Sequence, residues 1–205
     1  MPARARFKNR CSLGLAIVLV VFGAANPAMG QSLTPGPPGP FVLDVRGVTS
    51  GIPATETLFS GLPAGSAVPT RGFGGNVGGH VYAFQMGPGR LGFGMEMSFT
   101  GGSSADASAT LISVDPQVSF NFGTSDGWSY LSAGVGVTRI SADPVAVSDT
   151  VRAFNWGGGA RWFFRPPLGF GFDVRVRHLS ESEVLPGSMT VAAGVGFSLK
   201  TRSRQ

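Results

Sequence analysis

Segment 91–100 alternates strictly between large apolar residues and residues that are either glycine or polar. The apolar positions are Leu91, Phe93, Met95, Met97 and Phe99, and a glycine or polar residue follows each of them. A period of two places the two sets on opposite faces of a β-strand. A soluble sandwich turns its apolar face inward, whereas a membrane barrel turns that face outward to lipid. This segment alone fits both architectures.

The same alternation recurs along the chain and predicts eight strands. Their ranges are 41–48, 76–86, 91–100, 109–122, 128–139, 151–164, 168–180 and 188–199. In the second of these segments the pattern does not distinguish the two faces, and its register is left open.

The predicted connections alternate in length, which favours a barrel over a sandwich. Tight turns at 87–90, 123–127 and 165–167 alternate with longer connections at 49–75, 101–108, 140–150 and 181–187. All short turns then lie at one end of the sheet and all long loops at the other, as in outer-membrane barrels. We therefore predict an all-β chain that forms an eight-stranded antiparallel up-and-down transmembrane β-barrel over residues 41–199. A soluble periplasmic sandwich is the alternative.

The N-terminal segment has the pattern of an export signal. Four basic residues up to Arg10 precede an apolar stretch over 12–25, and small residues at Ala28 and Gly30 follow. This pattern predicts a signal peptide over residues 1–30 that is cleaved after Gly30. A membrane anchor is the alternative, but the apolar stretch is shorter than the ~20 residues that a spanning helix needs. A Pro/Gly-rich lead-in over 31–40 and a basic tail over 200–205 flank the predicted barrel.

The charge balance argues against nucleic-acid binding. The signal contains four of the 16 basic residues and none of the 11 acidic ones, so the mature chain has a net charge of +1. No basic patch interleaved with aromatic residues remains. The glycine-rich stretches are strands that no helix follows, which argues against a phosphate loop. We expect neither a metal site nor a cofactor, and beyond the signal no apolar run is long enough for a spanning helix.

The polar faces of the predicted strands contain as many acids as arginines. An eight-stranded barrel has an interior just wide enough for side chains to fill it. An unpaired charge in that interior costs several kcal/mol, so a balanced set predicts ion pairing and a plugged lumen. His80 is expected to be a lumen histidine. The predicted charge network comprises Asp44, Arg46, Glu96, Asp115, Arg161, Asp173, Arg175 and Arg177.

Aromatic residues gather near the predicted short turns. Trp128, Trp162, Phe163 and Phe164 lie within a few residues of these turns. Aromatic side chains form girdles where a barrel crosses the lipid interface. We predict a periplasmic girdle from these four, with ordinary core aromatics as the alternative.

Three glycine- and aromatic-rich stretches, at 130–137, 155–163 and 169–177, carry a family resemblance. The chain resembles small bacterial outer-membrane β-barrel proteins, the OmpA-like transmembrane domains and opacity-type surface antigens. The resemblance implies a place in the bacterial outer membrane, contact with its lipid and lipopolysaccharide, and recognition by the barrel-assembly machinery. Such barrels usually end on an aromatic assembly signal, whereas here eight residues follow Phe197.

The sequence leaves three functions in competition. The leading one is a structural or surface-interaction role, with loop 49–75 facing outward toward a partner. The second follows from a resemblance to lipid A deacylases, which carry a His-x-Ser pattern like His178-Leu179-Ser180. Glu181 and Glu183 are candidates to orient the histidine, although Glu181 stands where that family has Asn and no acid lies on the last strand. The third is a narrow small-solute channel.

Overall fold

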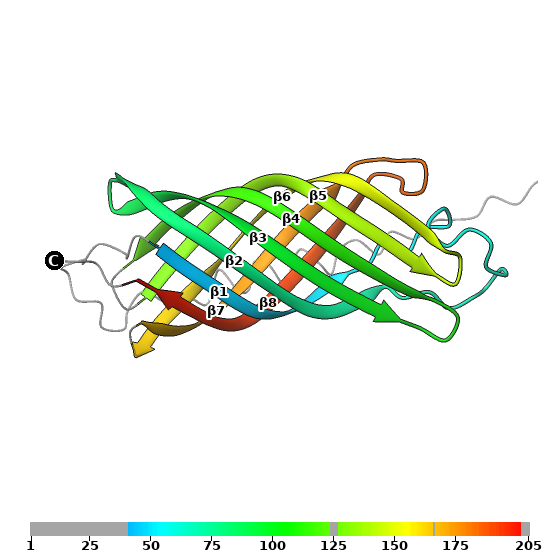
Figure 1. Cartoon of the computed structure of the whole chain (residues 1–205), viewed down its shortest axis with the longest axis horizontal. Coiled ribbons are helices and arrows are strands. Elements are labelled where there is room, and N and C mark those ends of the chain that lie inside the picture. The colour runs from blue at the N-terminus through cyan, green and yellow to red at the C-terminus, as the bar shows by residue number, and fades with distance from the viewer. Residues whose placement is uncertain (1–40, 124–126, 166, 202–205) are drawn as a thin grey trace, which may run out of the picture. The chain divides into compact units, whose positions relative to one another are not determined.

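The computed structural model describes residues 41–123, 127–165 and 167–201. The predicted signal peptide, the lead-in and most of the predicted tail lie outside these residues. The strands are β1 (Phe41–Gly51), β2 (Arg71–Met86), β3 (Gly89–Ser103), β4 (Ser108–Gly123), β5 (Gly127–Asp143), β6 (Val147–Arg165), β7 (Leu168–Leu179) and β8 (Ser188–Lys200). Each strand pairs antiparallel with the next, and β8 pairs with β1, so the sheet closes into a barrel (Figure 1). This confirms the predicted fold class.

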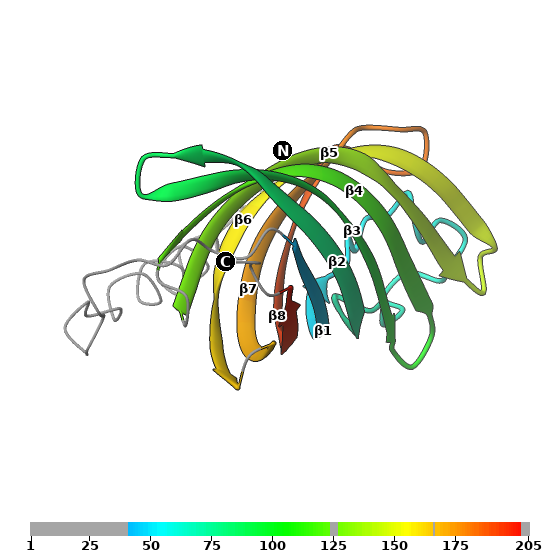
Figure 2. The ribbon, with the colours of Figure 1, turned by 60° about the vertical axis from the view of Figure 1, so that its left-hand side comes forward.

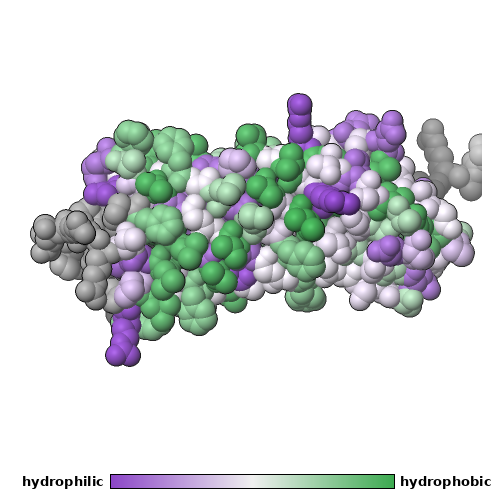
Figure 3. Space-filling view, viewed as in Figure 1, coloured by the Kyte–Doolittle hydropathy of each residue, from purple (hydrophilic) through white to green (hydrophobic). Residues whose placement is uncertain are grey.

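The alternation of each strand sorts its side chains between the lumen and the outer wall. On β3, Phe93 and Met95 are each about half exposed, whereas Glu96 is buried. Hydrophobic residues cover much of the wall seen in Figure 3. The barrel is therefore apolar on its outer wall and polar in the middle of its lumen. None of the described residues forms a helix long and apolar enough to cross a membrane.

The register of β2 is interrupted by a bulge. Asn76, His80 and Tyr82 are buried in the lumen, whereas Val77 and Val81 are exposed. The pairing with β3 shifts between Val81 and Phe84. A bulge inserts an extra residue and changes which face the following side chains occupy. The alternation fails at this point for that reason.

The strands extend further toward the long-loop end than the sequence predicts. The connection expected at 101–108 shrinks to 104–107, and the one expected at 140–150 shrinks to 144–146. Ile140 and Ala142 continue the inward alternation of β5 and are buried. The loop asymmetry therefore rests mainly on the connections 52–70 and 180–187. At the other terminus of the barrel, β8 includes Lys200, which the sequence places in the tail.

An apolar cluster fills the barrel at its long-loop end, and we call it the apolar plug. Its buried members are Ile52, Leu58, Phe59, Ala107, Ala109, Leu111, Ile140, Ala142, Val151, Ala153, Leu179 and Leu185. In Figure 2 the 52–70 connection, in cyan, lies at the same end of the barrel as the β5–β6 and β7–β8 connections. Loop 52–70 contributes the buried side chains of Leu58 and Phe59 to this cluster, so these two side chains point into the mouth of the barrel. The sequence predicts only a loop that faces outward.

A smaller aromatic cluster fills the short-turn end. It consists of Val42, Tyr82, Trp128 and Phe163, and the rings of Trp128 and Phe163 have centroids 4.7 Å apart. The Lys200 ammonium lies 4.4 Å from the Phe163 ring centroid. Both ends of the lumen are therefore occupied by side chains.

This arrangement corrects the predicted girdle. Trp128 and Phe163 are 1% and 3% exposed and point into the barrel, so the prediction that they face lipid is wrong. The physical reason is the strand period, because Arg161 is inward on β6 and Phe163, two residues later, shares its face. Trp162 and Phe164 point outward, at 48% and 66% exposed.

Candidate functional site

Asp44 on β1 organises the lumen near the short-turn end. The Arg161 guanidinium, from β6, donates to both Asp44 oxygens, at 2.9 Å from Nε and 2.6 Å from Nη2. Arg46 Nη2 lies 2.8 Å from Asp44 Oδ1, and the Ser198 hydroxyl donates to the same oxygen. A bidentate arginine and two further contacts satisfy a buried carboxylate that would otherwise be costly.

Tyr130 links this cluster to the middle of the lumen. Its ring lies under the Arg161 guanidinium, whose central carbon is 3.8 Å from the ring centroid. Its hydroxyl donates to Asp173 Oδ2 at 2.7 Å. The Tyr130 ring therefore makes a cation–π contact with Arg161, which is paired with Asp44. The Tyr130 hydroxyl donates to Asp173, which is paired with Arg175.

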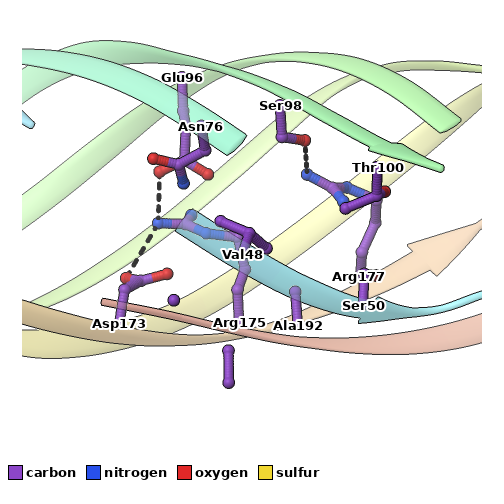
Figure 4. A pocket seen from close by; sticks show the side chains of 12 residues that line it. Val48, Ser50, Asn76, Glu96, Ser98, Thr100, Asp173, Arg175, Arg177 and Ala192 are labelled. Atoms are coloured by element: carbon purple, nitrogen blue, oxygen red, sulfur yellow. Dashed lines mark hydrogen bonds and ion pairs between the residues drawn. The ribbon is translucent and has the colours of Figure 1, made fainter. Parts of the chain in front are cut away.

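Arg175 is the centre of the second cluster (Figure 4). Its Nη2 donates to Glu96 at 3.0 Å and to Asp173 at 3.3 Å. Its Nη1 donates to Gln117 Oε1 at 2.7 Å and to Asn155 Oδ1 at 2.9 Å. The guanidinium is thus surrounded by four acceptors from four strands.

Arg177 forms the third cluster, with Asp115. Its Nη2 donates to Asp115 Oδ2 at 2.6 Å and lies 3.5 Å from the Ser98 hydroxyl. A cavity of only about 10 Å³ lies between this arginine and Glu96. That volume holds about one water molecule, so the side chains between Arg177 and Glu96 leave little open space.

The structure therefore places all eight residues of the proposed charge network inside the barrel. Each is at most 5% exposed, and each takes part in at least one of five ion pairs. The neutral partners of these residues were not predicted, and they are Tyr130, Gln117, Asn155 and Ser198. All four lie at inward-facing positions of the alternating pattern on β4, β5, β6 and β8, and this alternation predicts that they face the lumen. His80 is also buried there, with Nε2 3.0 Å from Gln117 Nε2.

The structure does not assemble the proposed catalytic residues into a hydrogen-bonded set. His178 is exposed at the end of β7, and its ring centroid lies 6.3 Å from that of Phe154. The Ser180 backbone amide donates to Arg152 O at 2.9 Å. In the part of the chain that the structure describes, no hydrogen bond or ion pair joins His178 to Ser180, Glu181 or Glu183. Nor does that part contain a group of three or more potential metal ligands.

A groove on the outer wall is a further feature that sequence reasoning did not predict. It has a volume of about 580 Å³ and lies between β4, β5 and β6. Valines and Phe154 line most of it, and Arg152 and Ser180 lie on its lining as well. The sequence signal for it is Pro116, a proline in the middle of a predicted strand.

Comparison with known proteins establishes the fold. No family model matches the sequence, and no curated protein matches it. The structure of Neisserial surface protein A is 16% identical, with a TM-score of 0.60 over 78% of this chain and 97% of that one. Ail of Yersinia pestis is 14% identical (TM-score 0.47; 79% and 99% covered), and the outer membrane enzyme PagL is 17% identical (TM-score 0.47; 78% and 99%). The chain has the fold of the small eight-stranded outer-membrane β-barrels, as the sequence resemblance predicts.

Proposed function

We propose that this chain is an exported protein of the bacterial outer membrane with a structural or surface-interaction role. The observation that carries the proposal is the filled lumen. Paired charges occupy its middle, and apolar clusters occupy its two ends. Because side chains fill the lumen, the surfaces left for contact with other molecules are the outer wall and the long-loop end.

The outer wall supports a membrane location. Strands on all sides expose large apolar side chains, among them Phe73, Met97, Val135 and Val195, each about half exposed or more. Soluble monomers rarely expose contiguous apolar patches larger than a few hundred Å². In a membrane these apolar side chains contact lipid instead of water. Because the sheet is closed, no strand edge with unpaired backbone groups lies in the lipid.

The long-loop end supports a surface role. The side chains of Leu58 and Phe59 anchor loop 52–70 in the apolar plug. Hydrogen bonds also join this loop to the 104–107 connection. Asp106 Oδ2 accepts from the Ala67 amide at 2.6 Å, and the Ser104 hydroxyl donates to Ala67 O at 2.7 Å. The loop therefore presents a fixed surface to a partner outside the cell. Outer-membrane lipid, lipopolysaccharide and the barrel-assembly machinery are the other proposed partners.

Cell fractionation and gel migration test the location, and planar bilayers test the role. The chain should fractionate with the outer membrane and migrate faster on gels before heating than after it. Single-channel recordings should show negligible conductance. A soluble periplasmic pool without heat-modifiable migration would contradict the location, and stable ion conductance would favour the channel instead.

One observation favours the esterase alternative, because Ser180 lies on the lining of the outer groove. A lipid in that groove would place an ester near this serine, with His178 two residues away as a base. A deacylation assay on purified lipopolysaccharide decides the question. We expect no released fatty acid, and activity lost in Ser180→Ala would overturn the non-enzymatic role.

A further inference from the structure

The outer groove arises from a gap in the β4–β5 ladder. The strands pair continuously except between Val114↔Val137 and Gln117↔Gly134. Pro116 lies in this gap and has no backbone N–H to donate. The register on both sides of the gap places Val135 opposite Pro116, and the next residue, Gly136, opposite Asp115. An added Cβ at Gly136 would overlap the Val114 carbonyl oxygen, so this part of the ladder combines a proline with a position that needs glycine.

The lining of the groove is mostly apolar and includes one cationic residue. Val114, Val135, Val137 and Phe154 form the apolar part. Toward the long-loop end, the residue that follows Phe154 on the same face of β6 is Arg152, which is exposed and pairs with Val137. An apolar groove with a charged residue at its edge matches the polarity of an acyl chain attached to a headgroup.

A second arginine lies beside the first. Val137 pairs with Arg152 and Arg139 pairs with Thr150, so Arg139 and Arg152 are diagonal neighbours on the outer wall. Both are exposed, and the Arg139 Nε donates to the Ser148 hydroxyl at 3.3 Å. Within the described residues neither arginine forms an ion pair. We call these two residues the arginine pair.

Four acids lie near the arginine pair. Asp149 lies three residues before Arg152 on β6 and accepts from the Thr150 amide. Asp143 lies four residues beyond Arg139, at the end of β5, and Glu181 and Glu183 lie in the 180–187 connection. No ion pair within the described residues joins any of these acids to Arg139 or Arg152. The wall therefore carries two arginines without an ion pair in the described part of the chain, and one of them lines the apolar groove.

We propose that the groove and the arginine pair bind a phosphorylated, acylated lipid of the outer leaflet. An acyl chain lies along the valines and Phe154, and the phosphate accepts hydrogen bonds from Arg152, with Arg139 beside it. Arginine suits this role because its planar fork bonds phosphate oxygens bidentately. The inference rests on the proposed function, because it requires this wall to face lipid.

Lipid A in phosphatidylcholine nanodiscs is the probe. The exported chain is reconstituted with a small fraction of lipid A, and the lipid retained per barrel is counted by native mass spectrometry. The comparison lipid is lipid A stripped of its phosphates, which keeps the same acyl chains. We expect the phosphorylated form to be retained about tenfold more strongly. Equal retention of the two lipids would reduce the groove to ordinary lipid-facing wall and overturn the proposal.

Matched variants separate the charge from the groove. Arg152→Gln should remove most of the preference for phosphate, whereas Arg71→Gln, an exposed arginine at the start of β2, should leave it unchanged. Val135→Trp should fill the groove and weaken retention of both lipids, whereas Val191→Trp on β8 should not. If a variant and its control lose lipid retention to the same extent, the proposed lipid site is wrong. Heat-modifiable migration verifies folding of each variant, and fractionation of the unaltered chain tests the outer-membrane location separately.

Discussion

The lumen and the apolar plug fill the same barrel by opposite means. In the lumen, each charged side chain depends on a particular partner at hydrogen-bond distance, such as Arg161 on Asp44. In the plug, the apolar side chains of Leu58 and its neighbours are buried by packing and not by hydrogen bonds or ion pairs. Loss of one charged partner leaves the other charge unpaired in an interior of low dielectric constant. Loss of one apolar side chain leaves a cavity. The first kind of region should therefore be less tolerant of single changes than the second.

Arg161→Met should have the largest effect. It removes the bidentate partner of Asp44 and the nearer of the two cations over the Tyr130 ring, and it leaves Arg46 and the Ser198 hydroxyl beside the carboxylate. Breaking a buried ion pair costs about 4 kcal/mol, and urea unfolding of the barrel in lipid vesicles measures it.

The double variant Asp44→Leu/Arg161→Met is its control. Asp44→Leu alone leaves both Arg46 and Arg161 without their ion pair, whereas the double variant leaves only Arg46 so. The double variant should therefore lose less stability than the sum of the two single effects. A loss equal to that sum would show that the charges are not coupled as the geometry indicates.

Leu58→Ala should have the next largest effect. The side chain is fully buried in the plug, and truncation of a buried leucine costs about 3 kcal/mol through lost transfer energy and the cavity that remains. The same urea titration measures the loss. Leu62→Ala, which shortens a partly buried neighbour in the same loop, should cost less, and an equal cost would contradict the packing described.

Tyr130→Phe should have a smaller effect than either. It keeps the ring under Arg161 and removes only the hydroxyl that donates to Asp173. Loss of one hydrogen bond to a buried acid costs about 1–3 kcal/mol. Ser129→Ala, on the neighbouring position of β5, serves as the control and should leave the unfolding midpoint unchanged.

Replacement of loop 52–70 by a short Gly-Ser connection should leave the conductance unchanged. The paired charges close the lumen below the plug, so the barrel should stay non-conducting in planar bilayers. The appearance of stable single-channel currents would show that the plug, and not the charge network, closes the barrel.

The lumen was accessible to sequence reasoning because strands have a period of two. Once Phe93 and Met95 are placed on one face, Glu96 must occupy the other, and the same logic places Asp115 and Arg175 inside. The same logic, applied to Arg161 on β6, would also have placed Phe163 inside. The girdle prediction failed because it relied on distance from a turn and ignored parity.

The plug and the groove were not accessible in this way. Leu58 and Phe59 lie in a loop, where no period relates neighbouring residues, so their burial depends on how the loop folds back. The groove depends on Pro116 and Val135, which lie on different strands and are brought together only by the register. The Pro116 signal is present in the sequence, but its partner follows only from the pairing.

The contacts of Asp44 bear on how the barrel closes. This carboxylate, on the first strand, meets Arg161 on the sixth and Ser198 on the eighth, residues separated from it by 117 and 154 positions. A closure of β8 on β1 that slips by one residue would move the apolar and polar sets of the slipped strand to opposite faces. If β1 is the slipped strand, Asp44 and Arg46 turn toward lipid, and if β8 is the slipped strand, Ser198 leaves Asp44. The buried charges of β1 therefore penalise a closure of β8 on β1 in the wrong register.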